Sequence, residues 1–323
     1  MKNSPDSHTI GLSIYRVILS FLVIKNMIFY YGTADEMFGA DTMVNYQLYH
    51  QIINRSVLAW LEYPFQLPYA AKAYIFLVFV LAFLFLFGIY KRVVGTLFCL
   101  SLMVLNLRNN FILDGSDNVM QVTLPFLVLA HSYNYFVYDV RLRALDGLQR
   151  NRWVALFTST GATWAARALM IQVCFIYFFT AIAKMQGSMW LNGTATYYTM
   201  RVEEFRQTAW NIPLTNNHYF VVLSTYFTVL WELSFAFLVW FRRTRLLVLL
   251  CGVALHVGIW FFMRIDNFSW IMIGTYFVFV TNQEYRLGAR AFDRARLLVR
   301  SWLKPRQPAA LAAEVEATPL ISE

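Results

Sequence analysis

The sequence predicts an all-α fold, a polytopic helical bundle in a membrane with about eight spans and both termini in the cytoplasm. Three observations support this prediction. Hydrophobic residues fill 59% of the 323 positions, whereas soluble domains use roughly 45–50% apolar residues. Long, almost uncharged runs recur along the whole chain, and Lys and Arg gather between alternate runs. We therefore expect one membrane domain over residues 1–283.

Eight segments approach the length that a membrane helix requires, which is about 20 mostly apolar residues for a hydrocarbon core of about 30 Å. They are residues 10–31, 73–90, 92–108, 118–139, 166–184, 218–241, 245–263 and 267–281. The first run continues to about Tyr31 without a small-residue cleavage site. We expect it to be a span and not a signal peptide.

Basic residues predict the orientation, because short loops rich in Lys and Arg remain cytoplasmic. One set of alternate loops contains Lys91, Arg92, Arg141, Arg143, Arg150, Arg152, Arg242, Arg243, Arg245 and the arginines from Arg286 onward. The opposite loops contain most of the acidic residues, including Asp35, Glu36, Asp114, Asp117, Glu203 and Glu204. An even number of spans then places both termini inside.

The C-terminal region follows a different pattern. Residues 284–304 alternate arginine with Leu, Phe and Val at helical spacing, which predicts a basic amphipathic helix on the inner leaflet. Residues 305–323 are expected to be a disordered tail, and the aromatic stretch 57–69 is expected in the interface. The net charge of +9 indicates anionic lipid as the partner, and no nucleic acid is expected.

Ionisable groups inside spans cost about 2.5–3.5 kcal/mol each, so they are candidates for function. At ~1.5 Å per residue, Glu232 and His256 both lie ~15–16 Å from the basic turn that joins their helices. A Glu232–His256 hydrogen bond is therefore predicted, either as a structural staple or as a catalytic or ligand-binding pair. No further ligand occurs at zinc spacing, so no metal is expected. Arg16 is expected to extend toward the inner surface.

Lys184 is predicted to lie near the outer edge of the membrane, ~25 Å along its helix from Arg167. Arg108, Asp114 and Asp117 reach a similar level from neighbouring spans. This convergence predicts Lys184 as a general base with Asp117 as its partner, and Arg108 and Asp114 as substrate-binding residues. Two alternatives stay open: Lys184 extending to lipid phosphate, and the two aspartates beginning a helix.

A sequence motif adds a family resemblance to these observations. The stretch "YFFTAIAKMQGSMWLNGTATYYTMRVEEF" contains Lys184, Met185, Gly187, Trp190 and Gly193. "NNFILDGSDNVMQ", "LWELSF" and "LHVGI" followed by "DNFSWIMIG" extend the match over nearly all the spans. The chain resembles the horizontally transferred transmembrane (HTTM) domain family, which is related to the membrane domain of vitamin K-dependent γ-glutamyl carboxylase. Its length and "WLNGTATYYTM" look most similar to sporulation-delaying protein B.

The resemblance implies a bacterial protein of the cytoplasmic membrane that matures or exports a small secreted antimicrobial peptide with a companion maturation protein. It also implies Lys184 as the base, Trp190 at the substrate and a quinone as the cofactor. Ser116, Asp117 and Asn118 stand where the carboxylase has Asn-Asn-His, so the carboxylase histidine is missing. Three functions stay open: peptide maturation by general-base or quinone-linked chemistry, peptide transport or binding without chemistry, and a quinone-dependent carboxylase-like activity.

Overall fold

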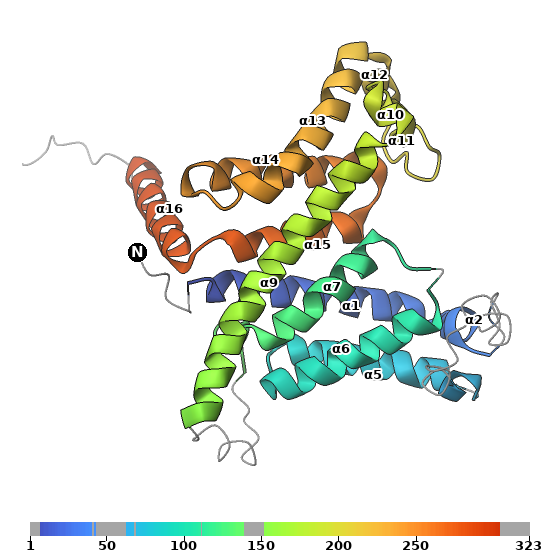
Figure 1. Ribbon diagram of the computed structural model, residues 1–323, viewed down its shortest axis with the longest axis vertical. Coiled ribbons are helices and arrows are strands. Elements are labelled where there is room, and N and C mark those ends of the chain that lie inside the picture. Colours follow the sequence, from blue (N-terminus) through green and yellow to red (C-terminus); the bar gives the residue numbers. More distant parts are fainter. Residues whose placement is uncertain are drawn as a thin grey trace, which may run out of the picture. The chain divides into compact units, whose positions relative to one another are not determined.

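The computed structural model describes residues 7–40, 42, 63–67, 69–110, 112–138 and 152–303. Every element of regular structure in these ranges is helical, which confirms the predicted all-α class (Figure 1). The chain divides into two units, Met1–Asn282 and Gln283–Glu323. The tail predicted at 305–323 and most of the stretch 57–69 lie outside the described residues.

The helices of the first unit begin and end as follows: α1 Thr9–Tyr31, α2 Ala34–Phe38, η2 Tyr63–Gln66, α5 Ala70–Leu86, α6 Lys91–Arg108, α7 Gly115–Leu129, α9 Arg152–Met185, α10 Ser188–Leu191, α11 Ala195–Thr199, α12 Asn211–Asn216, α13 His218–Leu238, α14 Arg242–Met263, α15 Asp266–Tyr276 and η3 Phe277–Phe279. Among the described residues, four helices are long and apolar enough to cross a membrane: α1, the 158–185 part of α9, α13 and α14. Helix α5 is a shorter apolar helix. The chain is therefore an integral membrane protein, while the count of eight spans and the orientation stay predictions.

Two helices differ in length from their predicted spans. Helix α7 ends at Leu129 although the predicted span continues to 139, because the backbone turns extended at Ala130. Helix α9 begins at Arg152, well before the predicted 166, because its first turns are too polar for a hydropathy rule and yet form a helix. Hydropathy locates the lipid-facing length of a helix better than it locates the helix ends.

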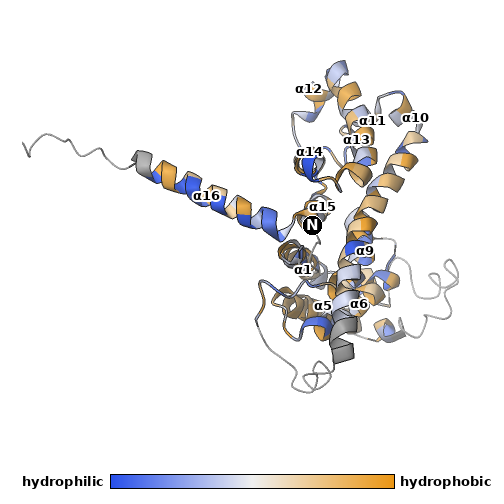
Figure 2. Ribbon diagram, turned by 60° about the vertical axis from the view of Figure 1, so that its left-hand side comes forward, coloured by the Kyte–Doolittle hydropathy of each residue, from blue (hydrophilic) through white to orange (hydrophobic). Residues whose placement is uncertain are grey.

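Helix α9 connects the two halves of the first unit (Figure 1). Helix α1 packs against α5 and α15, and α6 packs between α5 and α7. Helix α9 packs against α7 at one end and against α13 at the other, while α14 packs on α13 and α15. Large apolar side chains point outward from these helices, among them Phe179, Leu223 and Leu247, and Figure 2 shows the hydrophobic colouring of α9 and α13. Such surfaces suit contact with lipid tails.

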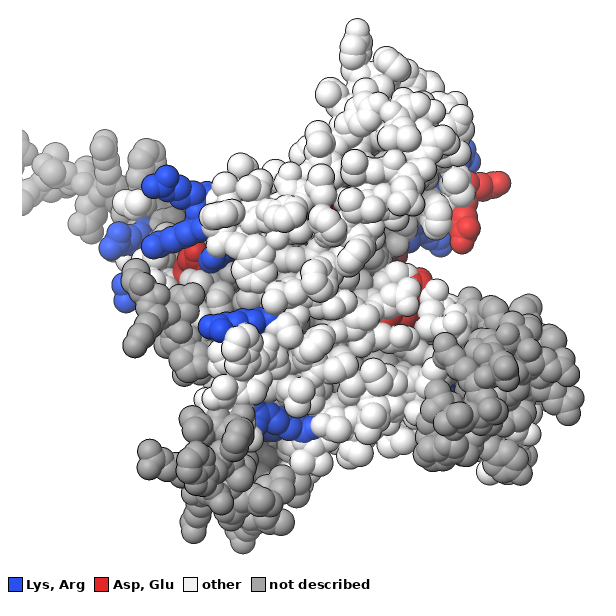
Figure 3. Space-filling view, in the orientation of Figure 1, with Lys and Arg blue, Asp and Glu red and all other residues white. Residues whose placement is uncertain are grey.

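The turns between successive long helices lie alternately at the two ends of the first unit. At one end the side chain of Asn282 accepts from the Ile10 amide at 3.0 Å and donates to the Thr9 hydroxyl at 2.8 Å. At the other end Lys25 pairs with Asp266 at 3.5 Å and Lys72 with Asp35 at 2.9 Å. In Figure 3 most of the visible acidic side chains lie on the right flank, with a few basic ones beside them. The orientation in the membrane stays a prediction from the sequence.

Arg16 joins the chain segments at the first of these ends. The expectation that it extends to the inner surface is wrong. Its side chain is fully buried. The guanidinium donates to carbonyl oxygens at the end of α5, at 2.6 Å to Phe85 and 2.7 Å to Leu86. It also donates to carbonyls after α7, at 3.0 Å to Ser132, 3.0 Å to Tyr135 and 2.7 Å to Phe136. The last carbonyls of a helix lack partners within that helix and carry partial negative charge, so one arginine satisfies groups from two chain segments.

The second unit contains α16, Asn282–Leu303. Among its described side chains from Gln283 to Arg300, Glu284 and Tyr285 are half-buried and the others are exposed. Leu287, Leu298 and Val299 lie on one face, and Arg286, Arg290 and Arg300 lie on the other, as the alternating colours in Figure 2 indicate. The helix and its amphipathic pattern are as expected, while its place on the inner leaflet stays a prediction.

The predicted orientation can be tested with a reporter fusion after Gln207. We expect alkaline phosphatase to be active there and a cytoplasmic fluorescent reporter to be dark, because 207 follows the ends of α9 and α11 on the acidic side. Fusions after Leu303 should give the opposite pattern. Phosphatase activity at the second site alone would reverse the orientation.

Replacing Arg16 should destabilise the fold more than replacing an exposed arginine. Hydrogen bonds from a charged group contribute about 1.5–3 kcal/mol each, so Arg16→Met should lower stability by about 3 kcal/mol or more. Arg16→Lys should be intermediate because an ammonium cannot reach five carbonyls from one position. Thermal unfolding of the detergent-purified chain measures both. Arg92→Lys is the matched control, since Arg92 makes one exposed bond of 3.3 Å to the Leu129 carbonyl.

Candidate functional site

A large cavity lies among α7, α9, α11, α13, α14 and α15, with a volume of about 690 Å³. Ligand pockets in proteins commonly measure about 300–1,000 Å³. The lining is mostly apolar, and the polar groups come from a few positions. They include Tyr177, Lys184, Glu232 and His256, together with Trp190 and several hydroxyl side chains. Apolar walls with a small convergent polar group are typical of a binding site for an amphipathic ligand.

Lys184 and Glu232 form an ion pair in the wall of this cavity. The Glu232 side chain is 8% exposed and that of Lys184 is 24% exposed. The Lys184 ammonium also lies 4.9 Å from the centre of the Trp190 ring. Lys184 is therefore held between a carboxylate and an aromatic face, both of which stabilise a cation. The predicted partners differ: Lys184 was expected to face Asp117, and Glu232 was expected to face His256.

The direction of helical side chains explains this correction. Counting residues along straight helices placed Lys184 and Glu232 about 10 Å apart in depth. Side chains on a helix lean toward its N-terminus. Because α9 and α13 run in opposite directions, Lys184 leans toward the centre of the bundle and Glu232 leans toward the outer end. The two functional groups meet although their backbones lie at different levels.

His256 belongs to a second hydrogen-bonded group beside the ion pair. Its Nε2 lies 2.9 Å from the Tyr177 hydroxyl, which is in turn hydrogen-bonded to the hydroxyl of Tyr276. The ring of His256 packs edge-on against Phe268 with centroids 5.5 Å apart. Sequence reasoning missed Tyr276 because a tyrosine in an apolar run gives no signal of its own. Its spacing of twenty residues from His256 would only be informative once α14 and α15 are known to be antiparallel.

Two buried polar atoms at the cavity have no hydrogen-bond partner in the described part of the chain. They are Oε2 of Glu232 and Nδ1 of His256, on side chains whose residues are 6% and 2% exposed. Buried polar atoms in native proteins are nearly always paired with protein or ordered water. Both residues line the cavity, while the two atoms themselves are enclosed in its wall.

Hydroxyl groups form a polar strip along another part of the lining. Thr196, Thr199, Ser224 and Thr228 line the cavity from α11 and α13. Ser224 and Thr225 each lie 3.0 Å from the Thr196 hydroxyl, which joins α11 to α13. Thr225 and Thr228 precede Glu232 by seven and four residues and therefore share its helix face, whereas no sequence feature indicates that α11 belongs to the site. This strip offers hydrogen bonds along the cavity and not only at the ion pair.

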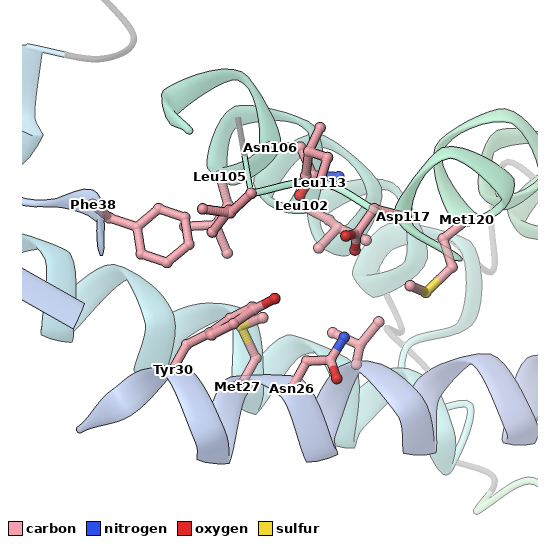
Figure 4. A pocket seen from close by; sticks show the side chains of 12 residues that line it. Asn26, Met27, Tyr30, Phe38, Leu102, Leu105, Asn106, Leu113, Asp117 and Met120 are labelled. Atoms are coloured by element: carbon pink, nitrogen blue, oxygen red, sulfur yellow. The ribbon is translucent and has the colours of Figure 1, made fainter. Parts of the chain in front are cut away.

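Asp114 and Asp117 begin helix α7, as the alternative interpretation of these residues predicted. The Asp114 carboxylate accepts from the amides of Ser116 at 2.6 Å and Asp117 at 3.1 Å. The Asp117 carboxylate accepts from the Asp114 amide at 3.1 Å, which completes a capping box. Asp117 faces a separate small pocket shared with Asn26 and Tyr30 (Figure 4). Its neighbour Asn118 lines the large cavity, because consecutive residues point about 100° apart on a helix.

Arg108 also lies away from the cavity. Its side chain is buried and donates to the carbonyl of Gly39 and toward the Thr42 hydroxyl at 3.5 Å. It therefore holds the segment that follows α2. Of the residues predicted to bind or transform a substrate, Lys184, Glu232, His256 and Trp190 line one cavity, whereas Arg108, Asp114 and Asp117 do not.

Comparison with known proteins identifies the family of this chain. A model of the HTTM domain matches residues 6–283, which covers the whole first unit apart from its first residues. No match was found among curated proteins or among solved structures. The matched range contains every residue of the cavity and all four helices that are able to span a membrane. The chain belongs to the HTTM domain family.

Proposed function

We propose that this HTTM-domain protein matures a small secreted peptide by proton transfer, with Lys184 as the general base and the large cavity as the binding site. One observation carries the proposal: the Lys184–Glu232 ion pair opens onto a cavity of about 690 Å³. A structural ion pair between membrane helices needs no such space beside it. The peptide as substrate rests on the resemblance of the Lys184 to Gly193 motif to peptide-processing members of the superfamily.

The ion pair can supply a base inside the membrane. In surroundings of low dielectric, an ammonium–carboxylate pair competes with the neutral pair of amine and carboxylic acid. The neutral amine of Lys184 then accepts a proton from the substrate, and an ammonium forms beside the carboxylic acid of Glu232. The substrate is left as its conjugate base, whose negative charge balances the new ammonium. Proton transfer of this kind requires that donor and acceptor come within about 2.6–3.2 Å, which the opening of the pair to the cavity allows.

The remaining polar groups suit binding of a peptide. Oε2 of Glu232 accepts a hydrogen bond, as a peptide N–H provides. His256 is held by Tyr177 at its Nε2, which leaves its Nδ1 as the ring nitrogen that is free to pair with a ligand. The hydroxyl strip of Thr196, Ser224 and Thr228 can pair with peptide groups along the cavity. Apolar walls then accommodate the side chains of a hydrophobic peptide.

Loss of the base should remove the product even when the folded amount is restored. We expect Lys184→Met to abolish the mature peptide in the medium and also to lower the amount of folded protein, because Glu232 is left buried without its partner. Adding Glu232→Gln should restore the folded amount, since the charge is then balanced, while the product stays absent. Mass spectrometry of secreted peptides and fluorescence size exclusion measure the two quantities.

Lys72→Met is the control for this experiment, because Lys72 forms an exposed pair with Asp35 and should leave product and folded amount unchanged. A mature peptide of normal mass from the double variant would refute the role of Lys184 as a base. A peptide of normal mass that is retained in the cells would instead favour transport without chemistry, in which the ion pair is a lock.

Filling the cavity should inhibit binding while keeping the fold. A Cβ added at Gly258 meets no atom within 4 Å outside its own helix, and Gly258 lines the cavity. We expect Gly258→Phe to reduce the mature peptide by about tenfold or more, with unchanged melting temperature. Gly161→Phe is the matched control, because Gly161 is also a helical glycine with free space and does not line the cavity. Equal effects of the two changes would contradict the assignment of the site.

A quinone is the cofactor that the resemblance implies, and the cavity fits its chemistry. The apolar walls suit an isoprenoid tail, and the ring could lie near Trp190 and His256, which would orient it. When bound, a hydroquinone would supply two electrons to an oxidising co-reactant. Lipid extraction from the purified chain, followed by mass spectrometry, should recover a quinone that Gly258→Phe excludes and Gly161→Phe retains. Recovery of no quinone from either protein leaves general-base chemistry as the only form of the proposal.

A further inference from the structure

The large cavity extends along α9 and α13 on both sides of the Lys184–Glu232 ion pair. Residues at steps of four line it before each partner of the pair: Gln172, Ile176 and Thr180 on α9, and Phe220, Ser224 and Thr228 on α13. We call the first set the α9 arm of the cavity and the second set the α13 arm. Residues four apart share a helix face, so each arm follows one side of its helix for about 18 Å.

The two arms point in opposite directions from the ion pair. Helices α9 and α13 pack against each other (Figure 1) and run antiparallel. At an antiparallel contact, the residues before Lys184 and the residues before Glu232 lie on opposite sides of the pair. A hydrogen bond places the α13 arm beside chain that follows α9, because the Thr196 amide donates to the Thr225 hydroxyl at 3.1 Å. The ion pair is therefore between the arms and not at an end of the cavity.

Each arm presents polar groups that suit a peptide backbone. In the α13 arm the Thr228 hydroxyl donates to the Ser224 carbonyl at 2.8 Å, so its oxygen stays able to accept from a peptide N–H. In the α9 arm the Gln172 side chain is half-buried, and it makes no hydrogen bond with any residue that the structure describes. A carboxamide carries the donor and acceptor groups of a peptide unit. Leaving it unpaired between apolar walls is costly, and a bound peptide removes that cost.

We propose that the substrate peptide occupies both arms, so that its reacting group lies inside the chain and not at a chain end. This inference rests on the proposed function. An extended peptide rises about 3.3–3.6 Å per residue, so an arm of about 18 Å takes about five residues. A terminal reacting group would fill one arm only and leave the polar groups of the other arm without partners.

Native mass spectrometry of the full chain in detergent tests the proposal with a series of peptides of alternating Ala and Leu, acetylated and amidated at their ends. We expect the affinity to rise with length up to about ten residues, because both arms are then filled. Gln172→Trp and Ser224→Trp each fill one arm. Each should end the rise at about five residues and weaken binding of the ten-residue peptide by about tenfold or more.

Ile171→Trp and Leu223→Trp are the matched controls. Each of these residues neighbours a lining residue, is exposed and does not line the cavity, so both variants should keep the original dependence on length. Ile176→Trp fills the α9 arm in a second way should Gln172→Trp lower the melting temperature. An affinity that stops rising at about five residues in the original protein, or an unchanged length dependence in Gln172→Trp and Ile176→Trp, overturns the proposal.

This measurement is independent of the chemistry at Lys184, because binding is recorded without turnover. A normal product from the double variant of Lys184 and Glu232 would refute the general base. The length dependence would then still establish a peptide site with two arms. Loss of the length dependence alone would refute the two arms and leave Lys184 as the base.

Discussion

A charge buried among membrane helices must be satisfied by the protein itself, because hydrocarbon cannot solvate it. Arg16 and Lys184 obey this constraint in different ways. Arg16 is surrounded by five carbonyl oxygens, which leaves its guanidinium fully occupied in a structural role. Lys184 has one carboxylate, one aromatic face and an adjoining cavity. The first arrangement fixes helix ends, whereas the second leaves the charged group within reach of a ligand.

The sequence predicts the fold class and the chemistry-bearing residues better than it predicts their partners. Hydropathy and charge alternation identify the helices. The cost of an ionisable group inside a membrane span selects Lys184, Glu232 and His256 as candidates for function. Partners depend on helix tilt and side-chain direction, which a residue count ignores. Depth counting therefore separates Lys184 from Glu232 and pairs Glu232 with His256. Arg16 shows the same limit, because its carbonyl partners lie in segments without any charge pattern.

At α7 the sequence allows two interpretations of the aspartates, a helix start and a role beside Lys184. The pattern of Asp114, Ser116 and Asp117 is a helix start by its own hydrogen-bonding capacity, and the structure uses both carboxylates for that purpose. Asp117 also lines the small pocket beside Asn26 and Tyr30, and the residue of this turn that lines the large cavity is Asn118.

The unpaired atoms are the feature that favours a binding site over a staple between helices. A staple is stable when every buried donor and acceptor finds a partner, since each orphaned group costs about 1–3 kcal/mol. Glu232 and His256 each use one polar atom within the protein and keep a second one without a partner in the described residues. Both second atoms belong to residues that line the same apolar cavity. A ligand that donates to Glu232 and pairs with His256 removes both costs at once, so polar groups on the ligand contribute affinity as well as orientation.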